Sequence, residues 1–167
     1  MPMFEACLEG RRSMLGDEHM DTCASLEALG DCWSEKGQYG KALAIFEKCL
    51  EINRRVRGED HPDTLSSLAA VANCHADKGK FKVALPLLES CLEAKRRVRG
   101  PKHFSTLSTM FQLAECHKEL KQFKQALSLY EECLEGRNGL LGAQHKDTVE
   151  CAKCVALMHR RLMKPSK

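Results

Sequence analysis

Cysteine and histidine are the residues of this chain best able to bind metal or act as nucleophiles, and most of them recur at one spacing. The 167 residues include ten cysteines and seven histidines. Two cysteine series advance in steps of 42 residues: Cys7, Cys49, Cys91 and Cys133, and then Cys32, Cys74 and Cys116. A residue that recurs in phase plays the same structural role in each repeat, and free cysteine packs as a small hydrophobe. We therefore expect these seven side chains to lie in the core.

The remaining cysteines offer little for metal or disulfide chemistry. Cys151-x-x-Cys154 has a helical spacing but lacks a second pair or a His-x-x-His to complete a zinc site. Cys23 lies outside the repeat and is expected to be exposed. Because the chain is rich in other core residues, it needs no disulfides, and a reducing compartment would keep its thiols free. We predict no metal site.

Four histidines share one position of the repeat, at His19, His61, His103 and His145. A role repeated four times in linkers indicates helix capping or linker packing rather than catalysis. The sequence contains no nucleophile elbow, no phosphate-binding glycine loop and no metal-binding helix motif. We predict a protein that is not an enzyme and needs no cofactor.

The composition limits the kinds of partner that we expect the chain to bind. Hydrophobic residues make up 43% of the chain, charged residues 29%, and the formal net charge is +3. This charge is too small to indicate nucleic acid or a membrane surface without a concentrated patch. No apolar stretch approaches the roughly 20 residues needed to cross a bilayer. The first residues do not resemble a secretory signal, so we expect a cytoplasmic protein with a protein or peptide partner, no nucleic acid and no membrane.

The elements that position these residues are helices. Cys-Leu-Glu recurs at 7–9, 49–51, 91–93 and 133–135, and each repeat holds two apolar periodicities of helical type separated by a tight turn. Helices begin where Asp60 or His61 can cap and Pro62 enters the first turn, and end where Gly100 permits a left-handed cap. Helices are predicted at 3–15, 21–37, 39–57, 62–78, 81–99, 104–120, 123–140 and 146–163.

The pattern Leu26-x-x-Leu29-Gly30-x-x-Trp33, followed by Ala42-x-x-x-Phe46, resembles the tetratricopeptide repeat. This resemblance implies an all-α fold, a right-handed α-α superhelix or solenoid of tetratricopeptide-like helical hairpins. Small residues such as Gly30 would let paired helices approach closely. We expect a single domain over 1–167, with a partial repeat, three full repeats and a C-terminal half-repeat or cap at 1–16, 21–58, 62–100, 104–142 and 146–163.

The segments 36–51 and 50–69 resemble the repeats of kinesin light chain and of related arrays fused to signalling ATPases. That resemblance implies a concave groove, lined by the first helix of each hairpin, that holds an extended peptide. The implied groove residues are Glu27, Asp31, Glu35, Asn73, Asp77, Phe111, Glu115, Lys118, Glu119, Arg160 and Arg161. Unlike kinesin light chain, the chain lacks paired asparagines before the core leucine, so the cargo recognition of that family does not carry over.

These features predict an adaptor or scaffold that binds a peptide segment of a partner protein. Basic partner residues would face the acidic end of the groove, acidic ones would face Arg160 and Arg161, and Phe111 and Leu157 would form an apolar floor. The alternative is a regulatory or sensor fragment of a larger signalling ATPase, since Met1 falls inside an expected helix. The incomplete N-terminal repeat also leaves self-association open. The basic runs 54–57 and 95–99 could attract phosphate, or could serve the helix dipole.

Overall fold

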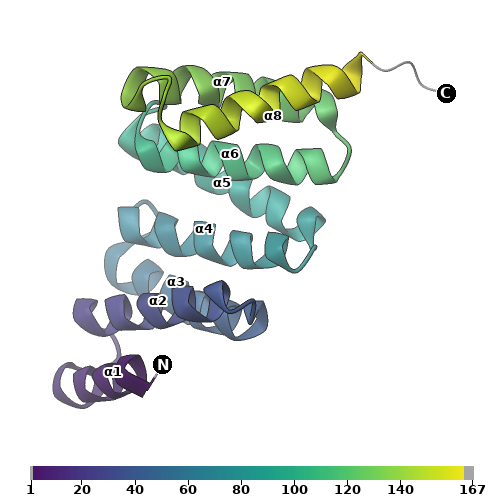
Figure 1. Ribbon diagram of the computed structural model, residues 1–167. Coiled ribbons are helices and arrows are strands. Elements are labelled where there is room, and N and C mark those ends of the chain that lie inside the picture. The colour runs from purple at the N-terminus through teal and green to yellow at the C-terminus, as the bar shows by residue number, and fades with distance from the viewer. Residues whose placement is uncertain (1, 164–167) are drawn as a thin grey trace. The chain divides into compact units, whose positions relative to one another are not determined.

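The computed structural model describes residues 2–163, and these residues form α-helices and no strands (Figure 1). The helices are α1 (Pro2–Leu15), α2 (Met20–Glu35), α3 (Tyr39–Arg57), α4 (Pro62–Asp77), α5 (Phe81–Arg99), α6 (Phe104–Glu119), α7 (Phe123–Leu141) and α8 (Lys146–Leu162). Every helix begins and ends within two residues of its prediction, and the all-α class is confirmed. Met1, from the predicted partial repeat, and residues 164–167, from the predicted domain, lie outside the described residues.

The helices fall into two compact units, one up to Lys80 and one from Phe81 onward. In the first unit α1 packs on α2, α2 on α3 and α3 on α4; in the second, α5 packs on α6, α6 on α7 and α7 on α8. Figure 1 shows that consecutive helices within each unit run in opposite directions. Each unit is therefore a stack of helical hairpins. None of the described helices is both long and apolar enough to cross a membrane.

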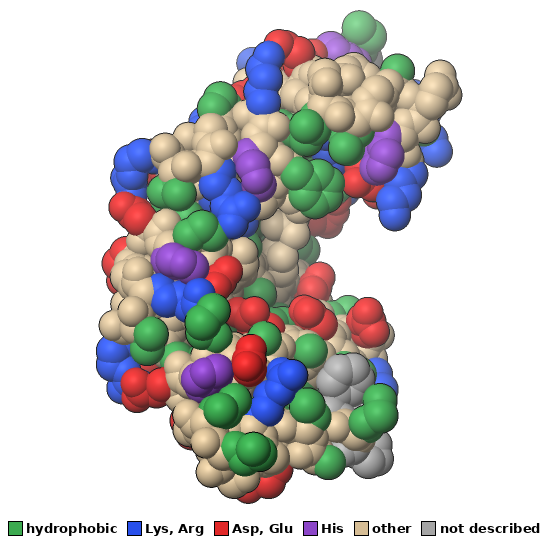
Figure 2. All heavy atoms as spheres, turned by 90° about the vertical axis from the view of Figure 1, so that its left-hand side faces the viewer, with side chains coloured by type: hydrophobic (Ala, Val, Ile, Leu, Met, Phe, Trp, Pro, Cys, Tyr) green, Lys and Arg blue, Asp and Glu red, His purple; other side chains and the backbone are tan. Residues whose placement is uncertain are grey.

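Histidine caps the first helix of every hairpin, and histidine side chains are visible in purple on the face drawn in Figure 2. The Nδ1 atom of His61 accepts a hydrogen bond from the backbone N–H of Asp63 at 3.2 Å. The same bond recurs at the start of α2, α6 and α8, from His19, His103 and His145. Asp60 and His61 were both predicted as possible caps, and His61 is the one whose side chain caps α4. Because Nδ1 of His61 accepts, the proton of that ring lies on Nε2.

Glycine ends the second helices, but not in the predicted left-handed helical conformation. Gly58 follows α3 with φ 90° and ψ 168°, and Gly142 follows α7 with φ 84° and ψ 159°. This region combines a positive φ with an extended ψ and is open essentially to glycine alone. The glycine is required as predicted, although it directs the chain into an extended linker.

The in-phase cysteines are mostly core residues. Cys49, Cys91 and Cys133 have no exposed surface, and Cys74 and Cys116 are buried as well. Cys7 is exposed and Cys32 is only partly buried, contrary to the expectation for these two. The prediction that Cys23 is exposed is wrong: its side chain is buried in a cluster that includes Leu8 of α1 and Ile52 of α3.

Two glycines allow side chains to approach a helix backbone closely. A Cβ atom on Gly30 of α2 would lie 2.7 Å from Cε1 of Phe46 and 2.9 Å from its Cζ. A Cβ atom on Gly136 of α7 would overlap Cδ2 of Leu107 and lie 3.1 Å from its Cδ1. The predicted role of Gly30, a close approach between paired helices, is confirmed. Gly136 makes an equivalent approach that its sequence context did not reveal.

Candidate functional site

The first unit gathers acidic side chains on α2 and α4. Asp31 and Glu35 of α2 and Asp77 of α4 are exposed, and Asn73 is half-buried. Partial burial raises the pKa of Asp31, and the charge of Glu35 raises it further. Burial also raises the pKa of Asp77. Within the part of the chain that the structure describes, Asp31, Glu35 and Asp77 form no ion pair.

Burial raises the pKa of the Cys74 thiol to about 11, and the charges of Asp77 and, more weakly, Asp31 add to the rise. Asp77 follows Cys74 by one helical turn on α4, whereas Asp31 belongs to α2. Carboxylates of two first helices therefore act on the same buried thiol.

Glu27 belongs to an internal network rather than to a free acidic surface. Its Oε1 atom accepts hydrogen bonds from Ser67 Oγ at 2.8 Å and Asn53 Nδ2 at 3.4 Å. Asn53 Nδ2 also lies 3.0 Å from Ser67 Oγ. Three helices, α2, α3 and α4, thus meet at this carboxylate. Burial raises the pKa of Glu27, and the bond from Ser67 only partly opposes that rise.

The raised pKa makes a testable prediction for Glu27→Gln. A carboxyl whose folded pKa lies above its unfolded value adds stability below the unfolded pKa, near 4.5, and loses it as pH rises through the folded pKa. At pH 7 the buried charge is therefore a cost that glutamine removes while its Oε1 still accepts from Ser67. We expect Glu27→Gln to raise the free energy of unfolding by up to about 1 kcal/mol at pH 7. The increase should be smaller at pH 4. Thermal melts followed by circular dichroism at both pH values measure the difference.

Exposed Glu9→Gln is the control, and a Glu27→Gln variant less stable than the parent at pH 7 would contradict the prediction.

In the second unit, Glu115 of α6 is the centre of a polar cluster. Its carboxylate accepts hydrogen bonds from the hydroxyl of Tyr130 on α7 and from Nζ of Lys118. Cys154 Sγ on α8 lies 3.8 Å from Glu115 Oε1. Burial acts to lower the pKa of Lys118, but its bond to Glu115 and the nearby acidic charge outweigh burial and raise it. Glu115 and Lys118 are therefore largely occupied by each other.

Phe111 is packed within the same unit. Its ring meets that of Tyr130 edge-on, with centroids 5.4 Å apart and an interplanar angle of 63°. The guanidinium of Arg137 lies 4.5 Å from the centre of the Phe111 ring. An edge-on aromatic pair and a cation over the ring face both stabilise this arrangement. Phe111 is thus held on α6 by two residues of α7.

A cleft of about 260 Å³ lies where the end of α6 and the start of α7 meet α8. Its lining residues are Lys118, Glu119, Lys121, Phe123, Leu157, Met158 and Arg161. The structure thus brings together the predicted residues Lys118, Glu119 and Arg161. Leu157 also lines this cleft, whereas Phe111 and Arg160 do not. Apolar side chains and three cations meet in one place.

Lys121 is a cleft residue that sequence reasoning missed. Its φ is 60°, whereas the equivalent turns hold Gly37 and Gly79, both with φ 71°. A lysine in this region carries strain that glycine avoids. The signal was present in the sequence, because Lys121 interrupts a series of glycines spaced by 42 residues.

A second missed feature is a polar position that recurs in all four second helices, at Arg11, Asn53, Lys95 and Arg137. Each of these side chains bonds to the following first helix. Arg11 donates to Asp21 O at 2.9 Å, and Arg137 donates to Asp147 O at 2.6 Å. Buried Lys95 donates to Thr109 Oγ1 at 2.9 Å. The position joins neighbouring hairpins, and its varied side chains hid it from a search for identical residues.

The basic run in the last turn of α3 forms ion pairs within the chain. Arg54 pairs with Glu59 at 3.0 Å, and Arg55 pairs with Glu18 at 2.5 Å. Arg57 pairs with Asp63 at 2.5 Å. These ion pairs support a local structural role for the run. No group of three or more potential metal ligands occurs among residues 2–163.

Solved structures similar to this chain are helical-repeat proteins. The TPR-like repeats of a Podospora anserina protein assigned as a kinesin light chain are 21% identical, with a TM-score of 0.78 over 95% of this chain and 75% of that one. BtubC (BKLC) from P. vanneervenii is 18% identical, with a TM-score of 0.82 over 98% of this chain and 65% of that one. The apo form of RapI is 16% identical, with a TM-score of 0.79 over 92% of this chain and 54% of that one. These likenesses confirm the predicted class of tetratricopeptide-like solenoid.

Sequence comparison assigns the family independently. No curated protein sequence matches the chain. The family model described as tetratricopeptide repeat matches residues 2–54, 34–97 and 68–139. These ranges together cover most of the chain and include α1 to α6 and most of α7. Proteins with these repeats are in general interaction scaffolds rather than enzymes. The capped hairpins, the close helix contacts and this match together show that the chain belongs to the tetratricopeptide repeat family.

Proposed function

We propose that this protein is a scaffold that binds an extended segment of a partner protein along the first helices of its hairpins. The observation that carries the proposal is the set of carboxylates on Asp31, Glu35 and Asp77, which have no cationic partner among the described residues. Burial raises the pKa values of Asp31 and Asp77, so the charges of these two residues are held there at a cost in free energy. Basic residues of a partner would offset that charge, because opposite charges meeting across an interface favour association.

The cleft at the end of the second unit supports the other half of the proposal. Lys121 and Arg161 border it, and Leu157 and Phe123 supply an apolar surface. A partner segment with an acidic residue next to an aliphatic one would match these cations and this apolar surface. The strained backbone at Lys121 adds support, because strain tends to persist at sites where it serves binding.

The test combines a peptide array with charge reversal in the purified chain. The reversed variant carries Asp31→Lys and Asp77→Lys and leaves Glu27 and Glu115 unchanged, because these two hold internal hydrogen bonds. We expect basic peptides to bind the parent and to bind the variant at least tenfold more weakly, equivalent to about 1.4 kcal/mol. Glu9→Lys serves as a control, since it adds positive charge away from the site.

Circular dichroism must first show that the reversed variant keeps its helices. If the variant binds basic peptides as well as the parent does, the acidic surface of α2 and α4 is not the recognition site. If no peptide binds the parent, the peptide-scaffold proposal is wrong. A regulatory role inside a larger signalling ATPase then becomes the better hypothesis.

A further inference from the structure

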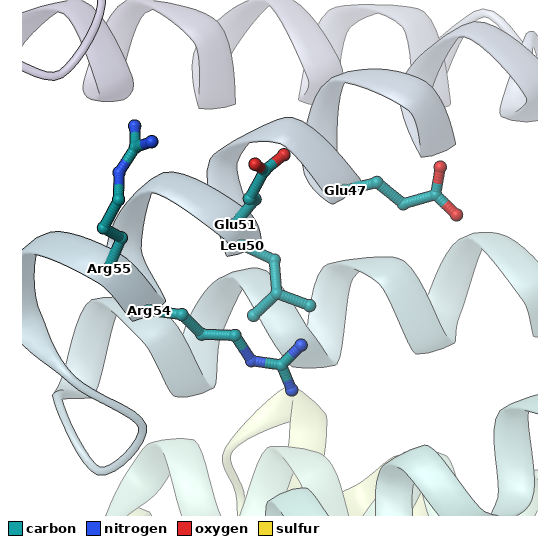
Figure 3. A pocket seen from close by; sticks show the side chains of 5 residues that line it. All are labelled: Glu47, Leu50, Glu51, Arg54 and Arg55. Atoms are coloured by element: carbon teal, nitrogen blue, oxygen red, sulfur yellow. The ribbon is translucent and has the colours of Figure 1, made fainter.

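Two clefts on the second helices are built from the same four positions of the repeat. The α3 cleft, of about 500 Å³, is lined by Glu47, Leu50, Glu51, Arg54 and Arg55 (Figure 3). The α5 cleft, of about 490 Å³, is lined in part by Glu89, Leu92, Glu93 and Arg96. The second set follows the first by 42 residues at every position. Each cleft lies within its own unit, and both are separate from the acidic residues of α2 and α4.

The charges of these clefts do not balance. Arg54 and Arg55 are paired with Glu59 and Glu18. In the α5 cleft, Arg96 is bound to both carboxylate oxygens of Glu132, at 2.6 and 2.7 Å. Glu47, Glu51, Glu89 and Glu93 are exposed and make no ion pair among residues 2–163. Each cleft is therefore acidic towards a ligand.

A leucine lies near the acidic pair in each cleft, although Leu50 and Leu92 are largely buried and Glu51 extends from the opposite side of α3 from Leu50 in Figure 3. Glu47 and Glu51 lie one helical turn apart, with Leu50 beside them, and Glu89, Glu93 and Leu92 repeat this pattern. In Figure 3 the side chains of Leu50 and Arg54 extend from the same side of α3. The α5 cleft has a wider apolar lining, because Leu113 of α6 and Leu129 of α7 also contribute. An aliphatic side chain beside two cations would match either cleft.

We propose that each cleft binds one basic, leucine-containing helix of a partner protein, so that the chain binds the same motif twice. On an antiparallel helix, the sequence Lys-Leu-x-x-Lys would place its two cations one turn apart and opposite the two glutamates, with the leucine over Leu50 or Leu92. The spacing of the ligand follows from the spacing of the site. Binding at these clefts does not depend on the groove proposed above.

The equivalent surface of α7 provides a matched control. Glu131 and Glu135 occupy the same repeat positions, but Asn138 replaces the arginine. Glu131 lies 3.3 Å from His159, and Glu135 lies 3.8 Å from Lys102. Neither glutamate lines one of the two clefts. Reversing both glutamates changes the net charge by the same amount without changing either cleft.

The probe is a synthetic, alanine-rich helical peptide that carries one Lys-Leu-x-x-Lys motif, added to the isotope-labelled full chain at 50 mM salt. Amide resonances measured by NMR should shift in two groups, at residues 47–55 and 89–97, with two peptides bound per chain. Glu47→Lys with Glu51→Lys should abolish the first group only, and Glu89→Lys with Glu93→Lys the second only. Glu131→Lys with Glu135→Lys should leave both groups unchanged.

Three outcomes would overturn the proposal: no shifts in either group, shifts that the cleft reversals leave unchanged, or shifts lost when Asp31 and Asp77 are reversed instead. The last outcome would place the peptide in the groove and support the scaffold proposal alone. If a lysine pair disturbs folding, the corresponding Glu→Gln pair removes the same carboxylates without reversing charge. That pair should reduce the shifts of its own group at least threefold.

Discussion

Replacing Tyr130 by alanine should lower the free energy of unfolding by about 3–5 kcal/mol, the usual cost of removing a buried aromatic ring. Among the side chains whose burial the structure describes, Tyr130 is the largest that is fully buried. Its ring packs on Phe111, and its hydroxyl donates to Glu115. Burial and the neighbouring carboxylate raise its pKa, so the hydroxyl stays protonated and remains a donor. Alanine would leave a cavity and remove that donor together.

Urea denaturation followed by circular dichroism measures this loss, and Tyr130→Phe separates its two causes. Phenylalanine keeps the ring and removes only the hydroxyl, so it should cost about 1.5–3 kcal/mol, as expected for one hydrogen bond to a charged group. A Tyr130→Ala variant within 1 kcal/mol of the parent would show that the junction between α6 and α7 relaxes around the cavity.

Gly136→Ile should destabilise the chain by about 2–3 kcal/mol, because it forces a branched side chain into a filled space. Even a Cβ atom at this position would lie 3.1 Å from Cδ1 of Leu107, which is itself buried. Isoleucine is nevertheless the residue that occupies the same repeat position in the first unit, at Ile52. There it shares a core cluster with Cys23, the counterpart of Leu107. The first unit pairs a large residue, Ile52, with a small one, Cys23. The second unit pairs a small residue, Gly136, with a large one, Leu107.

The double variant Gly136→Ile, Leu107→Cys tests that explanation. It copies the pair found in the first unit, so it should recover at least half of the stability that Gly136→Ile alone loses. A double-mutant cycle with Leu107→Cys measures the coupling between the two positions. If the two changes simply add, the clash does not lie between these side chains.

The fold could be predicted closely because its signals are local. Histidine caps, terminal glycines and the helical spacing of apolar residues all act within a few positions, and the helix bounds followed from them. Cys23 was missed because its burial depends on Leu8 and Ile52, which belong to other helices. The pattern of residues within one helix does not show which residues of other helices will pack against it.

The candidate site could be predicted only in part for the same reason. The helical phase of α2 and α4 predicts that Asp31 and Asp77 share one groove, and the charges of both act on the Cys74 thiol. Helical phase alone does not show whether a carboxylate is already hydrogen-bonded to another side chain. Glu27 is held by Ser67, 40 residues later, and Glu115 by Tyr130, 15 residues later. Both bonds depend on how neighbouring helices dock.

The polar position at Arg11, Asn53, Lys95 and Arg137 bears on how the chain folds. Hairpins with a strict 42-residue period offer nearly the same apolar face to every neighbour, and repeat proteins are prone to mispairing for this reason. The donor side chain differs between junctions, although its partners are alike: Arg11 meets Ser25 Oγ at 2.6 Å, and Lys95 meets Thr109 Oγ1 at 2.9 Å. A hairpin docked one repeat out of place would bring a side chain of a different length to the same hydroxyl position, and burying a lysine or arginine without a well-placed partner is costly. The changing length of this side chain therefore favours the correct order of hairpins where leucines alone would not distinguish it.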